Sequence, residues 1–217
     1  MPPAEAQHAA IAVFAKAPVP GVVKTRLIPV LGAERAARLQ AAMIRRVVTA
    51  AVEAGLGPVS MWCWPDTAHL LFQDLHARLG VELRSQCDGD LGQRMLHCFA
   101  SLCRAGPALL VGSDCPTLDG CALRRASDSL RAGADAVFLP AEDGGYVLAG
   151  LRHAEPCLFE GLQWGGSNVM AATRARLERL AWRWAEPLRL WDVDRPEDVE
   201  RLRVSGLMSE WFLENGA

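Results

Sequence analysis

Strand-like and helix-like segments alternate along most of this 217-residue chain, and this alternation restricts the fold more than any other feature. The apolar run at residues 9–15 (AAIAVFA) predicts a buried strand, and residues 33–55 have the apolar spacing of an amphipathic helix that ends at a glycine. Further strands are predicted at 58–64, 81–86, 108–113 and 134–141, separated by helices at 67–80, 90–106 and 118–133. Strands joined by helices of this length form a mainly parallel sheet with helices on both faces.

The pattern changes after Ala141. A strand predicted at 146–151 follows the preceding one across only four residues, EDGG, which is too short for a helical crossover, so it should enter the sheet antiparallel. A helix at 167–181, a strand at 182–190 and a helix at 195–206 complete the prediction, and no linker or repeat divides the chain. We therefore expect a single α/β domain over residues 1–217.

The composition excludes several classes of protein. A net charge of −2, a pI near 6.2 and the absence of a polybasic block argue against nucleic acid or an anionic membrane as a partner. Neither a signal peptide nor an apolar run of about 18 residues is recognisable, so we expect a cytoplasmic protein. Seven cysteines without a CxxC pair predict neither a disulfide framework nor a zinc site.

Charged residues gather where the predicted strands end. Because ligands bind beyond the carboxyl ends of the strands in open parallel sheets, these residues are candidates for a site. Carboxylates brought close together repel one another unless a cation lies between them. Eight residues are expected at this edge: Lys24, Arg26, Asp88, Asp90, Asp114, Asp143, Asp192 and Asp194.

The loop after the first strand, FAKAPVPGVVKTRL at residues 14–27, contains both lysines of the chain, Lys16 and Lys24; the other 21 basic residues are arginines. A lysine offers a compact point charge, which suits phosphate. Gly21 would let the backbone approach a phosphate while Lys24 and Arg26 supply charge, although the loop lacks the spacing of a Walker motif. The alternative is a rigid surface loop whose cations are solvated.

Asp114, in GSDCPTL, is a candidate ligand for a hard divalent cation, or else a turn or capping residue. Asp194, in WDVDRPED, is expected at the same edge, with Asp192 as the neighbouring candidate and helix capping as its alternative role. Asp90 is interpreted mainly as a helix cap, with nucleotide contact as the minority view. The tryptophans are interpreted as core residues, except that Trp164, before a Gly-Gly-Ser loop, is a candidate for an acceptor pocket; Trp211 should pack on the core or on a second subunit of a homodimer.

The motifs FAKAPVPGVVKTRL, DGDLGQRM, GSDCPTL, AEDGGYVLAGL and WDVDRPED occur in the order typical of the DUF2064 family of bacterial glycosyltransferase-A-like proteins, and the resemblance covers residues 9–202. It implies the three-layer nucleotide-diphospho-sugar transferase fold (GT-A, Rossmann-like), a mainly parallel sheet with one antiparallel strand, and Mg²⁺ or Mn²⁺ as cofactor. The chain departs from related sugar transferases in that its aspartate cluster at Asp114 reads SDC and is not a D-x-D triplet, and in having Val147 after Tyr146.

Together with the resemblance, these motifs give a set of expected site residues. The catalytic candidates are Lys24, Arg26 and Asp143, and the metal ligands are Asp114 and Asp194. The acceptor pocket is assigned to Gly144, Gly145, Tyr146 and Trp164, where the paired glycines indicate close approach of a ligand or a tight turn. The nucleotide-binding candidates are Ala15, Lys16, Ala17, Gly21, Lys24, Asp90, Arg94 and Ser113.

The leading hypothesis is a metal-dependent transferase that moves a glycosyl group from a nucleotide sugar to a small-molecule acceptor. A nucleotidyltransferase that releases pyrophosphate from a nucleoside triphosphate is the first alternative. A non-catalytic nucleotide-binding protein of the same fold is the second, because a fold does not fix a function.

Overall fold

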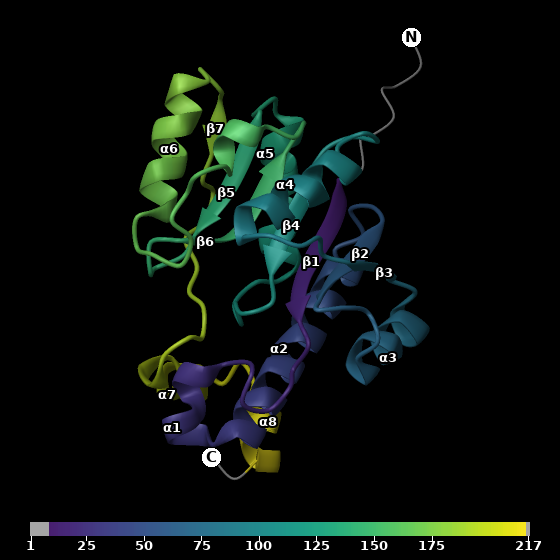
Figure 1. Ribbon diagram of the computed structural model, residues 1–217, viewed down its shortest axis with the longest axis vertical. Helices are drawn as coiled ribbons and strands as arrows, with labels where there is room; N and C mark the ends of the chain where they lie inside the picture. Colours follow the sequence, from purple (N-terminus) through teal and green to yellow (C-terminus); the bar gives the residue numbers. More distant parts are fainter. Residues whose placement is uncertain (1–8, 216–217) are drawn as a thin grey trace.

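The computed structural model describes residues 9–215, and in that part of the chain seven strands form one sheet in the order β3-β2-β1-β4-β6-β5-β7 (Figure 1). β6 pairs antiparallel with β4 and with β5, whereas the remaining pairs are parallel, which confirms the predicted mixed sheet. The strands are β1 (Ala10–Lys16), β2 (Val59–Trp64), β3 (Glu82–Ser85), β4 (Ala108–Gly112), β5 (Ala136–Pro140), β6 (Tyr146–Leu151) and β7 (Trp184–Ala185).

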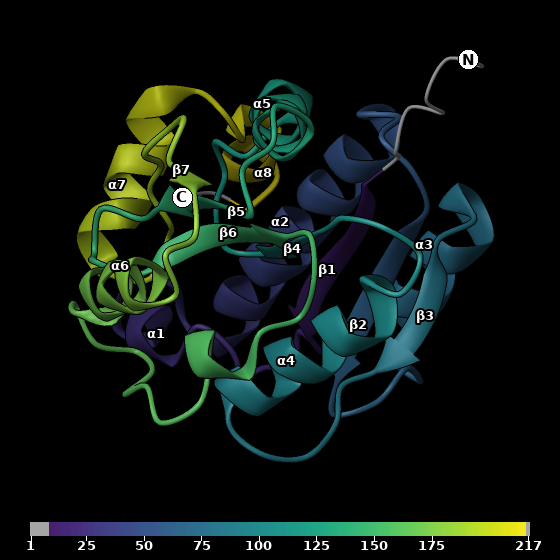
Figure 2. The ribbon, with the colours of Figure 1, turned by 90° about the horizontal axis from the view of Figure 1, so that it is seen from above.

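Helices cover both faces of the sheet, as near-continuous apolar strands require (Figure 2). The side chains of Ile11 and Val13 face one apolar core, which includes residues of α2 (Ala33–Glu53), α3 (Leu70–Leu79) and α5 (Gly120–Arg131). Ala12 and Phe14 face the other core, with α4 (Leu91–Leu102) and α6 (Val169–Arg179). The alternation of neighbours along β1 thus produces the three layers of the expected fold.

A third apolar cluster lies beyond the carboxyl ends of the strands. It joins α1 (Ile28–Leu31) and the start of α2 to α7 (Pro196–Ser205), α8 (Ser209–Asn215) and the segment around Trp191 (Figure 1). Trp211 and Phe212 are buried in this cluster, so they pack on the core of their own chain. The C-terminal segment is thereby held against the edge where the charged residues gather.

The predicted strand at 182–190 is largely wrong. Only Trp184–Ala185 forms a strand, and Leu190 adds an isolated bridge to Ala141. Pro187 interrupts the segment because proline has no N–H to give to a ladder of hydrogen bonds. The short helices α1 and α8 were not predicted. No helix within residues 9–215 has both the length and the apolar character needed to cross a bilayer.

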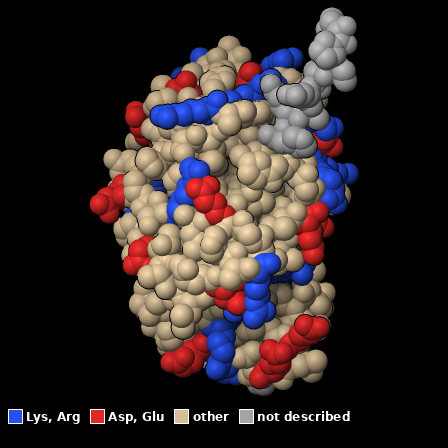
Figure 3. Space-filling view, turned by 90° about the vertical axis from the view of Figure 1, so that its right-hand side faces the viewer, with Lys and Arg blue, Asp and Glu red and all other residues tan. Residues whose placement is uncertain are grey.

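Charged side chains are dispersed on one face of the molecule. On the face shown in Figure 3, basic and acidic side chains lie in small interspersed groups, with no single basic area that dominates it. This distribution agrees with the small net charge of the chain.

Candidate functional site

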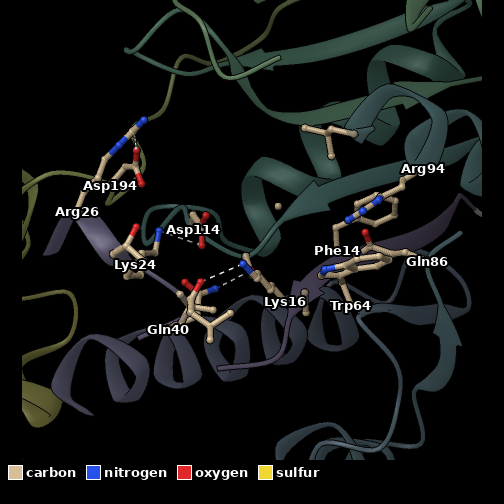
Figure 4. Close-up of a pocket in the computed structure, with 17 residues that line it drawn as sticks. Phe14, Lys16, Lys24, Arg26, Gln40, Trp64, Gln86, Arg94, Asp114 and Asp194 are labelled. Carbon is tan, nitrogen blue, oxygen red and sulfur yellow. Dashed lines mark hydrogen bonds and ion pairs between the residues drawn. The ribbon is translucent and has the colours of Figure 1, made fainter. Parts of the chain in front are cut away.

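A cavity of about 570 Å³ opens at the carboxyl ends of β1, β2 and β4 (Figure 4). Its two ends differ in chemistry: charged side chains from the basic loop and Asp114 lie at one end, and the aromatic rings, the Gln86 amide and the guanidinium of Arg94 lie at the other. The lining residues with functional side chains are Phe14, Lys16, Lys24, Arg26, Gln40, Trp64, Gln86, Arg94, Ser113, Asp114 and Asp194.

Lys24 is held at the floor of the charged end. Its backbone is left-handed, with φ 48° and ψ 40°, and its side chain is only 4% exposed. The Nζ atom donates to the Val193 carbonyl at 2.5 Å and forms an ion pair with Asp114 Oδ1 at 3.1 Å. A left-handed lysine is uncommon and persists only where surrounding contacts determine it. Lys24 therefore joins the basic loop to β4 and to the C-terminal segment.

Lys16 and Arg26 lie nearer to solvent. The Nζ atom of Lys16 donates to the carbonyl of Val22 at 3.0 Å, which closes the loop on itself. Arg26 forms an ion pair with Asp194, and both side chains are roughly half exposed. Asp194 does not cap α7, because the N-cap position is Arg195. The carboxylate of Asp198 accepts from the backbone N–H groups of Asp194 at 3.0 Å and Arg195 at 2.7 Å.

The lining of the 570 Å³ cavity includes a pair of buried polar residues, one from α2 and one just after β4. Gln40 of α2 donates through Nε2 to the hydroxyl of Ser113 at 3.0 Å, and both residues are buried. The sequence pattern had indicated Ser113 but not Gln40, which stands as a polar residue within an apolar helix face. The polar residue that interrupts this apolar face was the signal in the sequence for Gln40.

The other end of the cavity contains Phe14, Trp64, Gln86 and Arg94. The guanidinium of Arg94 lies 3.6 Å from the centroid of the Trp64 ring, and its Nε donates to the carbonyl of Gly89 at 3.0 Å. Of these four residues, only Arg94 was predicted. Trp64 ends β2 and Gln86 follows β3, so their positions at strand ends were the signal for them.

Three carboxylates converge beside the charged end. Asp114, Asp143 and Asp192 line a small cavity of about 150 Å³ together with Tyr146. Burial, followed by the nearby charges of Asp143 and Asp114, raises the pKa of Asp192 from 3.8 to about 6. Within residues 9–215, no three side chains of histidine, cysteine, aspartate or glutamate already surround a common point as metal ligands would.

A further cavity of about 420 Å³ adjoins this cluster, and Arg26, Asp143, Asp192 and Asp194 form part of its lining. Its far wall is formed by Gly165, Gly166 and Ser167 and by residues at the start of α7. Arg201 makes a bidentate ion pair with Glu142 at 2.7 and 3.0 Å and lies 4.3 Å from the ring centroid of Trp191. The Arg26–Asp194 ion pair lines both this cavity and the 570 Å³ cavity. The small carboxylate cavity shares Asp114 with the larger cavity and shares Asp143 and Asp192 with this one.

The residues predicted for an acceptor pocket lie at the turn between β5 and β6 and beside α4. Gly144 has φ +96°, and a Cβ there would lie 1.9 Å from the carbonyl oxygen of Ser167, so this glycine admits a neighbouring loop. Gly145 donates its backbone N–H to Asp143 Oδ1 at 2.9 Å. Tyr146 packs edge-on against Trp164, whose buried Nε1 has no hydrogen-bond partner in the described chain.

Most of the predicted nucleotide-binding residues come together, and three do not. Ala15, Lys16, Lys24, Arg94 and Ser113 line the 570 Å³ cavity. Those outside its lining are Ala17, which donates its N–H to Trp64 O at 2.7 Å; Gly21, in the loop with φ +78°; and Asp90, which caps α4 through Gln93 N at 2.9 Å.

Comparison with solved structures places the fold among nucleotide-handling proteins. A protein of Desulfovibrio desulfuricans G20, provisionally named a nucleotide-diphospho-sugar transferase, is 28% identical with a TM-score of 0.84, over 95% of this chain and 90% of that one. CMP:2-keto-3-deoxy-manno-octonic acid synthetase complexed with CTP is 15% identical with a TM-score of 0.59, over 93% of this chain and 99% of that one.

The inositol-1-phosphate CTP transferase from T. maritima is 11% identical with a TM-score of 0.57, over 96% of this chain and 97% of that one. At such identities the last two likenesses concern the fold alone. No curated protein matches the sequence. A family model described as an uncharacterised protein conserved in bacteria matches residues 47–166, which is more than half of the chain. The chain therefore belongs to the DUF2064 family.

Proposed function

We propose that this protein is a transferase that binds a nucleotide-activated donor in the 570 Å³ cavity and passes a group to a small-molecule acceptor, all within one domain. The observation that carries the proposal is the two-ended cavity at the carboxyl edge of the sheet, with cations at one end and flat side chains at the other. A nucleotide has the same division, because its phosphates are charged and its base is flat.

At the charged end, Lys16 and Arg26 are exposed enough to meet phosphate oxygens, while Lys24 supplies a fixed positive charge on the floor. Such preorganised cations stabilise the charge that develops on a leaving phosphate. Lys24 also holds the Asp114 carboxylate in place, at 3.1 Å. We therefore assign electrostatic stabilisation of the leaving phosphate to the charged end, without a covalent bond to the protein.

The carboxylate oxygens beside the charged end of the cavity suit a hard divalent cation such as Mg²⁺ or Mn²⁺. Carboxylate oxygens are the ligands these ions prefer, and Oδ1 of Asp114 is buried without a well-aligned hydrogen bond. We propose Asp114 and Asp192 as the ligands in place of Asp194, because Asp114 and Asp192 line the same small cavity whereas Asp194 lies outside its lining and pairs with Arg26. A bound cation would neutralise phosphate charge during transfer.

The adjoining 420 Å³ cavity is the proposed acceptor site. Asp143 lines both it and the small carboxylate cavity, and Asp114 lines both that small cavity and the donor cavity. We therefore assign to Asp143 the role of accepting a proton from an acceptor hydroxyl. Glycosyl transfer would release a nucleoside diphosphate, and nucleotidyl transfer would release pyrophosphate. A non-catalytic nucleotide-binding protein would release neither.

The first test is calorimetric titration of the protein with nucleoside diphosphates, nucleotide sugars and nucleoside triphosphates, with and without Mg²⁺ or Mn²⁺. We expect binding that strengthens with the cation and weakens about tenfold or more in Asp114→Asn. Asp128→Asn, on the exposed face of α5, is the matched control and should bind like the wild type. Failure of every nucleotide to bind would overturn the proposal, and analysis of the released product identifies the reaction.

A further inference from the structure

We propose that Gln86 selects the nucleobase at the aromatic end of the cavity, favouring bases that carry an amino group over uracil. This inference rests on the proposed function, which it deepens by naming the class of donor. Gln86 follows β3, lines the cavity and lies beside Trp64 and Arg94 (Figure 4).

The amide of Gln86 is fixed in orientation. Its Nε2 donates to the carbonyl of Trp62 at 2.7 Å, and its backbone N–H donates to the carbonyl of Cys63 at 3.0 Å. A backbone carbonyl can only accept, so the nitrogen of the side-chain amide must face Trp62 and Oε1 must point away from it. Gln86 therefore offers Oε1 as an acceptor to a ligand in the cavity, whereas one of the two N–H donors of Nε2 is already used by the Trp62 carbonyl.

Arg94 and Trp64 provide a flat surface beside that acceptor. The guanidinium of Arg94 lies over the Trp64 ring at 3.6 Å from its centroid, and its Nε is held by the carbonyl of Gly89. Bases stack on arginine and aromatic planes with little regard to their identity. The stack can thus hold any base, which leaves discrimination to Gln86.

An acceptor at this position distinguishes the common bases. Guanine, adenine and cytosine each carry an amino group that can donate to Oε1 of Gln86. Uracil has no amino group, and its single ring N–H lies between two carbonyl oxygens, one of which would face Oε1. One hydrogen bond gained or lost at such an edge corresponds to about tenfold in affinity.

The test measures the affinities of GDP, ADP, CDP and UDP by calorimetry for the full chain. The wild type should bind UDP about tenfold more weakly than the best of the other three. In Gln86→Met this preference should shrink to about twofold, because the acceptor is gone, while UDP affinity should stay the same or rise. In Arg94→Ala all four affinities should fall together, with the preference retained.

Gln73→Met is the matched control. Nε2 of Gln73 also donates to a backbone carbonyl at 2.7 Å, that of Thr67, but Gln73 does not line this cavity. It therefore loses the same kind of bond and should keep the wild-type preference. If UDP binds as tightly as the amino-bearing nucleotides, or if Gln86→Met keeps the full preference, the inference is wrong while the proposed function stands. If none of the four binds, the inference is wrong, and the proposed function is overturned with it only if the nucleotide sugars and triphosphates of the first test also fail to bind.

Discussion

Replacing Lys24 by methionine should destabilise the protein by about 2–3 kcal/mol. A charge-assisted hydrogen bond such as that from Lys24 Nζ to Val193 O at 2.5 Å is worth roughly 1.5–3 kcal/mol. The ion pair with Asp114 adds less than about 1 kcal/mol, because that carboxylate is 47% exposed and screened by solvent. Methionine keeps most of the buried aliphatic length, so the loss measures the ammonium rather than a cavity.

Urea denaturation followed by tryptophan fluorescence measures this change, and the melting temperature should fall by about 5–10 °C for a chain of this size. Lys16→Met is the control, since its exposed ammonium donates to a neighbouring carbonyl of the same loop, and it should change stability by no more than about 0.5 kcal/mol. If Lys24→Met is as stable as Lys16→Met, the ammonium does not join the loop to the C-terminal segment, and our account of the site floor is wrong.

Three further outcomes test other parts of the structure. The fold raises the pKa of Asp192 to about 6, so the contribution of this group to the free energy of unfolding should fall as the pH rises from about 4 to 6. In chelator-treated buffer at pH 7.5, Asp192→Asn should therefore be more stable than the wild type by about 1 kcal/mol after allowance for solvent screening. Equal stability of the two proteins would contradict the clustering of carboxylates. Gly144→Ala should cost more than about 3 kcal/mol in urea denaturation because its Cβ would meet the Ser167 carbonyl, whereas Gly21→Ala, also at positive φ but in open space, should cost about 1 kcal/mol. Trp211→Ala should destabilise by about 3–5 kcal/mol if the C-terminal helices belong to the core, and a neutral effect in the same measurement would show that they do not.

The order of helices and strands could be predicted because apolar periodicity differs between them. Long amphipathic helices such as α2, and fully apolar strands such as β1, are specified by local pattern alone. The length of β7 was overestimated because the apolar residues around Pro187 pack without forming a ladder of hydrogen bonds with a neighbouring strand. The helix α8 is only seven residues long, and its burial depends on contacts with α2 that local sequence does not reveal.

The site residues show the same difference between what local sequence specifies and what long-range contacts decide. Charged residues that directly follow strands, such as Asp114, could be predicted because the topology brings all parallel strand ends to one edge. Gln40 and Gln86 were not predicted, since a glutamine within an apolar helix face or after a strand shows its role only once its partner is known. The exchange of Asp194 for Asp192 as the proposed ligand likewise depends on Arg26, which lies 168 positions away in the sequence.

The structure gives a physical reason why an arginine-rich chain retains lysine at position 24. The Lys24 side chain is 4% exposed, and its single nitrogen reaches both the Val193 carbonyl and the Asp114 carboxylate from one point. A guanidinium is wider, planar and carries five N–H donors, so in the same space it would leave several donors buried and unpaired. At Lys16 the ammonium is exposed and makes one bond to Val22, a position where arginine would meet no such restriction. Lys24→Arg should therefore lower stability and nucleotide affinity in the two assays above, whereas Lys16→Arg should leave stability unchanged.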